Sequence, residues 1–401
     1  MSTISSSSDH DAGVPWHVDV PRPPADRTVY RSNTLRLSPA SGSRGRHATV
    51  NVGLVIPMHG PAGIFGLSCT ACAVLAGEEI NDEGGLLGRE VRLVPIDGAG
   101  PPDAVANRVD SMVRSGAVDA ITGWHLSHVR RAIVTRLRGG VPYVYSSLYE
   151  GGERHPGVFL AGETPERQIG PALSWLSQQM GIRRWAVVGD DYVWPRGSAD
   201  AVYDFVGLLD LKITDELFVP LGQHDFSPVI ERLRRSSAQG ILMLLVGQDA
   251  VHFNRAFAAA GLDQRMVRLS SLMDENMLLA SGAEATGGLF SAAGYFGDLA
   301  TADALDLLGR YTRRFGPEAP VLNSMGESCY EAMRLLATLV QRTGSLDVRG
   351  LLRTAREPVG FHGPRGSVHL EDRHLRQRVY LARADGTVFD VVTQLPRLPN
   401  A

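Results

Sequence analysis

From Val50 onward, short apolar segments alternate with amphipathic ones, and this alternation restricts the fold more than any other feature of the sequence. Residues 52–56, 91–96, 118–122 and 141–145 are apolar runs of strand length, and the segments between them have helical spacing and helix-ending residues. A repeated strand–helix–strand pattern requires a parallel sheet with helices on both faces. The sequence therefore predicts a doubly wound α/β unit over this region.

The same pattern begins again after residue 165, with further strands expected at 185–189, 213–219, 240–246 and 267–269. We therefore expect two doubly wound lobes with a ligand cleft between them, because such sheets bind ligands at the carboxyl ends of their strands. The expected boundaries are a disordered tail over 1–49, a first lobe of 50–164 plus about 292–355, and a second lobe of 165–291 plus about 356–401.

The first 49 residues are rich in Ser, Pro, Arg and Asp and have no hydrophobic periodicity. They contain no apolar stretch of the ~7–15 residues that a secretory signal needs, and the first cysteine is Cys69. No stretch reaches the ~18 uninterrupted apolar residues of a membrane span. These features predict a cytoplasmic protein with no membrane association. A wrongly assigned start codon is the alternative.

Charge and motifs argue against several classes of function. The net charge of −3 provides no basic field, and we recognise no DNA-binding helix pair, so no direct contact with nucleic acid is expected. The chain has no G-x-S-x-G elbow, P-loop or H-E-x-x-H motif. Residues 60–63 (Gly-Pro-Ala-Gly) follow the first strand with the wrong spacing for a dinucleotide site. These observations predict a protein that is not an enzyme and carries no cofactor.

Two pairs of residues have the spacing of metal or redox sites. Cys69 and Cys72 form a C-x-x-C, but no second motif supports a zinc or thioredoxin-like role, and small residues on one helix turn explain them better. His125 and His128 are three residues apart and have no acidic residue near them in the sequence. The sequence therefore predicts no metal site.

Three predicted strand ends carry side chains suited to a small polar ligand. Residues 123–128 (Gly-Trp-His-Leu-Ser-His) and 145–150 (Tyr-Ser-Ser-Leu-Tyr-Glu) follow strands of the first lobe, and 190–196 (Asp-Asp-Tyr-Val-Trp-Pro-Arg) follows the first strand of the second. Taken alone, Ser127 is explained as a helix cap and the aromatic residues as packing. The repetition of polar and aromatic clusters on both lobes favours a ligand site in the cleft.

These segments resemble type I periplasmic-binding-protein-like proteins over about residues 50–390. Within that group they resemble the short-chain amide and urea branch, typified by the amide-sensing negative regulator of the aliphatic amidase operon and similar to nitrile hydratase operon regulators. The markers are residues 81–88, 123–128, 149–151 and 189–196, and the turn 363–366 with His374 downstream. The first marker is shared by the whole superfamily, whereas the strand-end segments are specific to the amide branch.

Carried over by position, the resemblance implies a ligand site made of His125, Ser127, Tyr145, Ser147, Tyr149, Tyr192 and Trp194. Ser127 and Ser147 would hydrogen-bond an amide, and the tyrosines would line the pocket. His125 and Trp194 stand where the family usually has Tyr, and Leu148 where it usually has Pro. Since His and Trp change the volume and polarity of the pocket, an amide larger than acetamide is an expected ligand.

The resemblance and the missing signal together predict a cytoplasmic amide sensor that regulates an amidase or nitrile hydratase operon through a partner protein, an antiterminator or a transcription factor. Ligand would act by shifting the lobes toward a closed arrangement. The alternative is the substrate-binding component of an amide, urea or branched-chain amino-acid ABC transporter. An amidase, the third class, lacks a nucleophile with a convincing base. The sequence leaves open which amide binds, the sign of regulation and the oligomeric state.

Overall fold

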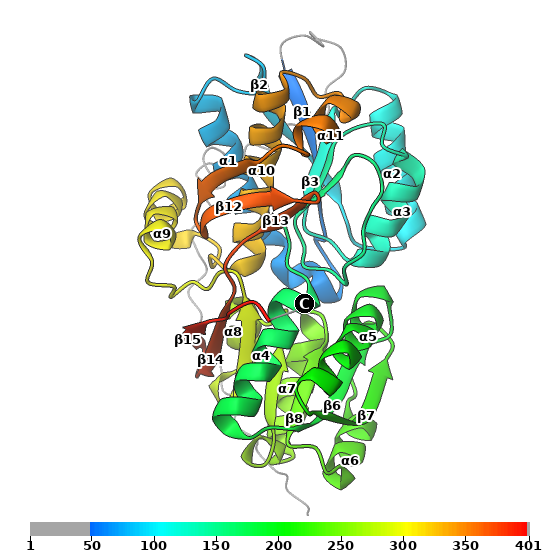
Figure 1. The fold of residues 1–401 in the computed structure, drawn as a ribbon, viewed down its shortest axis with the longest axis vertical. Helices are drawn as coiled ribbons and strands as arrows, with labels where there is room; N and C mark the ends of the chain where they lie inside the picture. Colours follow the sequence, from blue (N-terminus) through cyan, green and yellow to red (C-terminus); the bar gives the residue numbers. More distant parts are fainter. Residues whose placement is uncertain (1–48, 399–401) are drawn as a thin grey trace, which may run out of the picture. The chain divides into compact units, whose positions relative to one another are not determined.

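The computed structural model describes residues 49–398 of the chain (Figure 1). The tail predicted over 1–49 lies outside these residues except for its last position. Two doubly wound sheets with helices make up the described part, as the alternating pattern predicts.

In the described part of the chain, eight strands form the first sheet, in the order β11-β12-β13-β5-β4-β3-β1-β2. They are β1 (Thr49–Ile56), β2 (Glu90–Asp97), β3 (Ala120–Gly123), β4 (Tyr143–Tyr145), β5 (Val158–Leu160), β11 (Val359–Gly363), β12 (Gly366–Glu371) and β13 (His374–Arg376). Strands β1 to β5 pair in parallel, whereas β12 pairs antiparallel with both β11 and β13.

Side chains of β1 alternate between the two faces of the first sheet. Val52 and Leu54 belong to the core under α1 (Gly66–Asp82) and α10 (Ser324–Thr343), whereas Val55 belongs to the core under α2 (Pro102–Arg114) and α3 (Ser127–Leu137). This alternation follows from the two-residue period of a strand, and both faces are apolar because helices cover both. Figure 1 shows α1 and α10 side by side on one face and α2 and α3 on the other.

The helix α1 with the turn before it is long and apolar enough to cross a membrane by length and composition, over Pro61–Asp82. However, 72% of the relevant window is buried inside the protein. Its neighbours are α10, β1 and β2, and Cys69 and Cys72 are both fully buried. The helix therefore has the properties of a core helix.

In the same described range, seven further strands form the second sheet, in the order β15-β14-β10-β9-β8-β6-β7. They are β6 (Arg184–Asp190), β7 (Lys212–Val219), β8 (Gly240–Leu244), β9 (Val267–Ser270), β10 (Leu289–Ala293), β14 (Tyr380–Asp385) and β15 (Val388–Gln394). The helices between them are α4 (Pro165–Met180), α5 (Val193–Leu208), α6 (Ser227–Arg235), α7 (Gln248–Ala259) and α8 (Glu275–Ser281). α4 packs against α5, and α7 packs against α6 and α8.

The two sheets repeat one strand order. In the first sheet the chain runs from β1 outward to β2 and then crosses back to β3, and in the second it runs from β6 to β7 and back to β8. Each sheet therefore has a switch point, between β1 and β3 and between β6 and β8. Loops diverge at such points and leave room for a ligand at the carboxyl ends of the strands.

The C-terminal region corrects the expected lobe boundaries. We expected all of 356–401 in the second lobe, but β11, β12 and β13 belong to the first sheet, where β13 pairs with β5 through His374 and Leu160. Only β14 and β15 join the second sheet, through β10. The helices α9 (Ala302–Phe315) and α11 (Val348–Thr354) contact α1 and α10 respectively.

Candidate functional site

The carboxyl ends of the strands of the two sheets face each other. Tyr192, which follows β6, packs edge-to-face on His128 of α3, with 5.0 Å between the ring centroids. The turn Pro61–Phe65 follows β1 and contacts α7, which follows β8. At Gly247 the two backbones are so close that a Cβ would lie 2.0 Å from the carbonyl oxygen of Pro61. We call this boundary between the two sheets the seam.

Two helix N-caps meet across the seam. Asn323 caps α10 and Asp274 caps α8, each accepting from a backbone N–H at 2.9 Å. The amide of Asn323 also donates to Asp274 Oδ2 at 2.7 Å. Asn276 of α8 donates to the hydroxyl of Ser68 in α1 at 3.1 Å. The start of α8 in the second sheet is thereby hydrogen-bonded to α1 and α10 of the first.

Most of the predicted ligand residues are buried near the carboxyl ends of β3 and β4, at the edge of the first sheet that borders the seam. His125, Ser127, Tyr145, Ser147 and Tyr149 each have at most 2% of their surface exposed. Trp194 is also buried, and Tyr192 is partly buried. The structure thus brings His125, Ser127, Tyr145 and Ser147 together at the ends of β3 and β4, with Tyr149 beside them. Tyr192 and Trp194 follow β6 of the other sheet. Their contact with a ligand stays a prediction.

The side chain of His125 is held inside the first sheet. Its Nδ1 lies 3.1 Å from the carbonyl oxygen of Val55, and its Nε2 lies 2.5 Å from the hydroxyl of Tyr143. Burial lowers the pKa of His125 to about 3, so the ring is neutral, with Nδ1–H donating to Val55 and Nε2 accepting from Tyr143. Both ring nitrogens are therefore used by the protein itself.

The hydroxyl of Ser147 fixes the backbone of His125. It accepts from the N–H of His125 and donates to the carbonyl oxygen of the same residue, both at 2.9 Å. Tyr145 donates its hydroxyl to that oxygen as well, at 2.6 Å. Because a serine hydroxyl has one proton, Ser147 in this arrangement keeps only acceptor capacity for a ligand.

Arg130 organises this region, although the sequence analysis did not identify it. It lies one turn after Ser127 on α3 and is 1% exposed. Its guanidinium pairs with Glu150 at 2.8 Å and with Glu153 at 3.2 Å, and it donates to the Ser127 hydroxyl at 3.4 Å. Burial opposes the ionisation of Glu150, but Arg130 outweighs it and the pKa of that carboxyl lies below its usual value. The available signal was the i, i+3 spacing from Ser127.

Arg130 also lies over two of the predicted tyrosines. Its Cζ atom is 5.1 Å from the ring centroid of Tyr145 and 4.8 Å from that of Tyr149. The hydroxyl of Tyr149 in turn contacts Nε2 of His374 in β13 at 2.5 Å. Cation–π contacts of this kind favour one orientation of each ring. The loops after β3 and β4 and the strand β13 are therefore held as one unit.

Two buried aspartates form a second polar pair, on the other sheet. Asp190 ends β6 and accepts from the N–H of Val246 at 2.8 Å. Asp249, in the first turn of α7, accepts from the N–H of Gly222 at 2.6 Å. Oδ1 of each carboxyl group has no donor among the described residues, and burial followed by the charge of Asp249 raises the pKa of Asp190 well above its usual value. One proton shared between the two carboxyl groups would give both of these oxygens a partner.

Three of the buried hydrogen-bond donors that have no partner among the described residues follow the strands β3, β9 and β10. They are the indole Nε1 of Trp124 after β3, the hydroxyl of Ser271 after β9, and the hydroxyl of Tyr295 after β10. Each of the three side chains is at most 2% exposed. Since a buried donor without a partner costs about 1–3 kcal/mol, each of the three is able to donate to an acceptor from outside the chain.

Among residues 49–398, no three His, Cys, Asp or Glu side chains are arranged to hold a metal ion. Cys69, Cys72 and Cys329 are free and buried between α1 and α10, and burial raises the pKa of the Cys69 and Cys72 thiols. These cysteines therefore pack as small apolar residues.

A family model described as periplasmic binding protein matches residues 49–388. A curated relative, Leu/Ile/Val-binding protein homolog 6 of Brucella melitensis, is 24% identical over 361 residues, which cover 85% of this chain and 90% of the relative. A solute-binding protein of an ABC transporter from Rhodopseudomonas palustris HaA2, solved with p-hydroxybenzoic acid, superposes with a TM-score of 0.78 at 20% identity, covering 88% of this chain and 98% of that one. The branched-chain amino acid transporter substrate-binding protein LivJ of Streptococcus pneumoniae, solved with isoleucine, gives a TM-score of 0.73 at 19% identity, covering 86% and 99%.

The comparisons correct part of the sequence analysis. The expected cytoplasmic location is wrong, because proteins of this family bind their ligands outside the cytoplasm, as periplasmic or ABC-transporter binding proteins. They support neither the amide-sensing branch nor a regulator partner, and they favour the transporter alternative. The relatives are named as binding proteins, which agrees with a function other than catalysis. With two doubly wound sheets and a family model that matches nearly all of the described residues, this chain belongs to the periplasmic binding protein family.

Proposed function

We propose that this protein is the solute-binding component of an ABC transporter and that it binds a small organic molecule at the seam. The three unpartnered donors at Trp124, Ser271 and Tyr295 are the observation that carries the proposal. They come from both sheets, so a ligand that satisfies them all holds the sheets together. A binding protein that delivers its solute to a transporter works by such ligand-stabilised closure.

The chemistry of the donors suggests the ligand class. An indole N–H can only donate, and hydroxyls without partners are free to donate, so the ligand must offer acceptor oxygens. A carboxylate provides several acceptor sites on two oxygens. The relatives solved with isoleucine and p-hydroxybenzoic acid bind carboxylates, and we propose a small carboxylate for this chain as well. Phe65 packs on Trp124 with 4.6 Å between ring centroids and supplies an apolar surface for the rest of the ligand.

A short-chain amide is the second ligand class. Ser127 and Ser147 lie at neighbouring strand ends, as the resemblance to amide-binding proteins implies. Ser147 keeps a lone pair that an amide N–H₂ could donate to, whereas a carboxylate could not use it. Butyramide therefore belongs in the same titration as the carboxylates.

Calorimetric titration of the full chain with isoleucine, p-hydroxybenzoate, butyramide and urea tests the proposal. We expect a carboxylate to bind and Tyr295→Phe to weaken it by about 5- to 150-fold, the equivalent of one lost buried hydrogen bond. Tyr203→Phe is the matched control, because Tyr203 is 52% exposed on α5 and its hydroxyl bonds Glu216. Binding that Tyr295→Phe leaves unchanged would contradict the assignment of the seam.

Thermal unfolding without ligand separates a ligand role from a structural one. A structural hydroxyl stabilises the protein, and its removal lowers the melting temperature. An unpartnered buried hydroxyl costs stability, so Tyr295→Phe should leave the melting temperature unchanged or raise it. The transporter role is then tested by uptake of the identified solute in a strain that lacks this protein and carries either the wild-type chain or the variant.

A further inference from the structure

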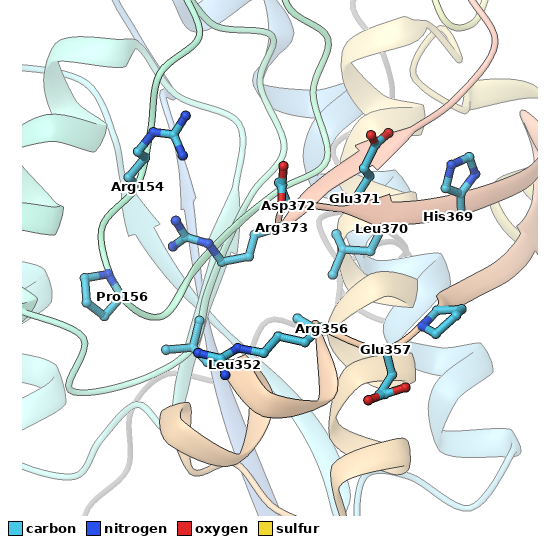
Figure 2. A pocket seen from close by; sticks show the side chains of 12 residues that line it. Arg154, Pro156, Leu352, Arg356, Glu357, His369, Leu370, Glu371, Asp372 and Arg373 are labelled. Atoms are coloured by element: carbon cyan, nitrogen blue, oxygen red, sulfur yellow. The ribbon is translucent and has the colours of Figure 1, made fainter.

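A pocket lies on the first lobe, away from the seam residues. It has a volume of about 850 Å³ and is lined by the loop 154–156, the end of α11 with the residues that follow it, and the turn between β12 and β13 (Figure 2). None of the residues that line it contributes one of the seam contacts described above. Its volume falls in the range of about 300–1,000 Å³ that small-molecule sites occupy.

The wall formed by the β12–β13 turn is fixed in place. Asp372 and Arg373 both have positive φ angles, 48° and 67°, which residues other than glycine rarely adopt. The carbonyl oxygen of Arg373 accepts from the N–H of Leu160 in β5 at 2.9 Å, and its guanidinium donates to the carbonyl oxygen of His155. The turn and the loop opposite it are thereby joined, so the pocket is formed before any ligand binds.

Three guanidinium groups line the pocket without a carboxylate partner. Within residues 49–398, no ion pair joins Arg154, Arg356 or Arg373 to an acid. Figure 2 shows Arg356 and Arg373 extending toward the side of the pocket where Arg154 lies, and the carboxylates of Glu357 and Glu371 on the other side. Glu371 is already paired with Arg376 at 2.8 Å. Asp372, the third acid of the lining, lies between the arginines and these glutamates, so the excess of positive charge is confined to the side of the pocket with the three arginines.

Apolar side chains complete the lining. Leu352, Leu370, Pro156 and Pro358 lie between the charged groups, and Leu370 is almost fully buried. An inorganic anion would leave this surface uncovered, whereas an organic ligand would cover it. A single carboxylate is fully bound by one guanidinium group. A phosphomonoester carries close to two negative charges and three acceptor oxygens, so it can bind several guanidinium groups at once.

We propose that this pocket binds a small organic phosphomonoester, with the phosphate among Arg154, Arg356 and Arg373 and the apolar body over Leu352 and Leu370. This site is independent of the seam and of the solute proposed for it. The protein would then respond to two ligands at separate places on the chain.

Titration of the full chain with phenyl phosphate tests the site, with inorganic phosphate, benzoate and phenol as comparison ligands. We expect phenyl phosphate to bind most tightly, because only it combines the dianion with an apolar body. Arg356→Gln should weaken it about tenfold or more, the loss of a charge-assisted hydrogen bond. Arg353→Gln is the matched control, since Arg353 is an exposed arginine in the last turn of α11, three residues before Arg356, and does not line the pocket.

Arg356 has no side-chain partner in the described chain, so its variant should fold normally, and its melting temperature checks this. The proposal is overturned if phenyl phosphate does not bind, if Arg353→Gln weakens it as much as Arg356→Gln, or if Tyr295→Phe weakens it instead. The last result would show that phenyl phosphate binds at the seam. Affinity for the seam solute should be the same in Arg356→Gln and wild type, so failure here leaves the proposed function standing.

Discussion

Replacing Asp190 with asparagine tests whether two carboxyl groups share one proton at the end of β6. In the wild-type protein one oxygen of Asp190 accepts from Val246 N–H, and one oxygen of Asp249 accepts from Gly222 N–H. The remaining oxygen of each has no other donor, which leaves the two oxygens to hold a proton between them. An asparagine at 190 can accept from Val246 with its oxygen and donate to Asp249 with its nitrogen.

The expected changes in the free energy of unfolding follow from the hydrogen bonds that each substitution keeps or removes. Asp190→Asn keeps both hydrogen bonds, so the free energy of unfolding near pH 7 should change by less than about 1 kcal/mol. Asp190→Ala leaves the Val246 N–H and the Asp249 carboxylate without partners and should cost about 1–3 kcal/mol. In the double variant Asp190→Asn with Asp249→Asn, two amide nitrogens face each other as donors. Its loss should therefore exceed the sum of the two single losses.

The pH dependence has a defined sign. The pKa of Asp190 is raised above its ordinary value of 3.8 in the folded state, so the folded protein binds this proton more tightly than the unfolded chain. The stabilisation is complete below the ordinary value and is lost as pH rises from there through the raised pKa, by at most about 1.4 kcal/mol per pH unit. Asp190→Asn cannot lose a proton, so its stability should fall less than that of wild type toward alkaline pH.

Urea unfolding followed by circular dichroism measures wild type and the four variants, including the single variant Asp249→Asn. The assay covers about pH 5 to pH 9, a range chosen to include the loss of stability toward alkaline pH. Two results would refute the shared proton. One is a loss for Asp190→Asn as large as for Asp190→Ala, and the other is a wild-type pH profile that the asparagine leaves unchanged.

Three further variants test the first lobe. Ser147→Ala removes the acceptor of the His125 N–H and one of the two donors to its carbonyl oxygen, and it should lower the free energy of unfolding by about 1–3 kcal/mol in urea titration, whereas a purely ligand-binding serine would leave it unchanged. Arg130→Met leaves the buried carboxylates of Glu150 and Glu153 with only their exposed partners, Arg131 and His155, and should cost about 3–5 kcal/mol. Arg131→Gln removes only the exposed partner of Glu150 and should cost less than about 1 kcal/mol, and equal losses would contradict the role of Arg130.

The alternating apolar pattern was sufficient to predict both sheets, because each central strand is a short apolar run between helices. It could not place β11 to β13. These strands carry polar residues at alternate positions, as edge strands do, and β13 joins the first sheet through a single residue pair with β5. The choice of sheet edge depends on tertiary contacts such as that between Tyr149 and His374, which no local pattern contains.

In the candidate site, too, the direction of single side chains could not be predicted from the local sequence. The resemblance implied His125 as a ligand residue because of its position in the segment 123–128. In the structure His125 points into the core under α2 and α3, whereas the preceding Trp124 points to the other face with its Nε1 unpartnered. Which of two neighbouring side chains faces the seam depends on the backbone direction after β3, and residue type alone does not determine it.

The turn 363–366 served in the sequence only as a marker of resemblance, but it carries a residue that connects the two sheets. Arg365 is fully buried and pairs with Glu163 at 2.9 Å, on the segment between β5 and α4. The same oxygen of Glu163 accepts from the N–H of Gly294 at 2.9 Å, on the segment that leaves β10. Two of the chain segments that pass between the sheets are thus tied to one carboxylate oxygen. Since a Cβ at Gly294 would lie 2.4 Å from that oxygen, glycine is required there, and the relative position of the sheets depends on a buried ion cluster as well as on the seam.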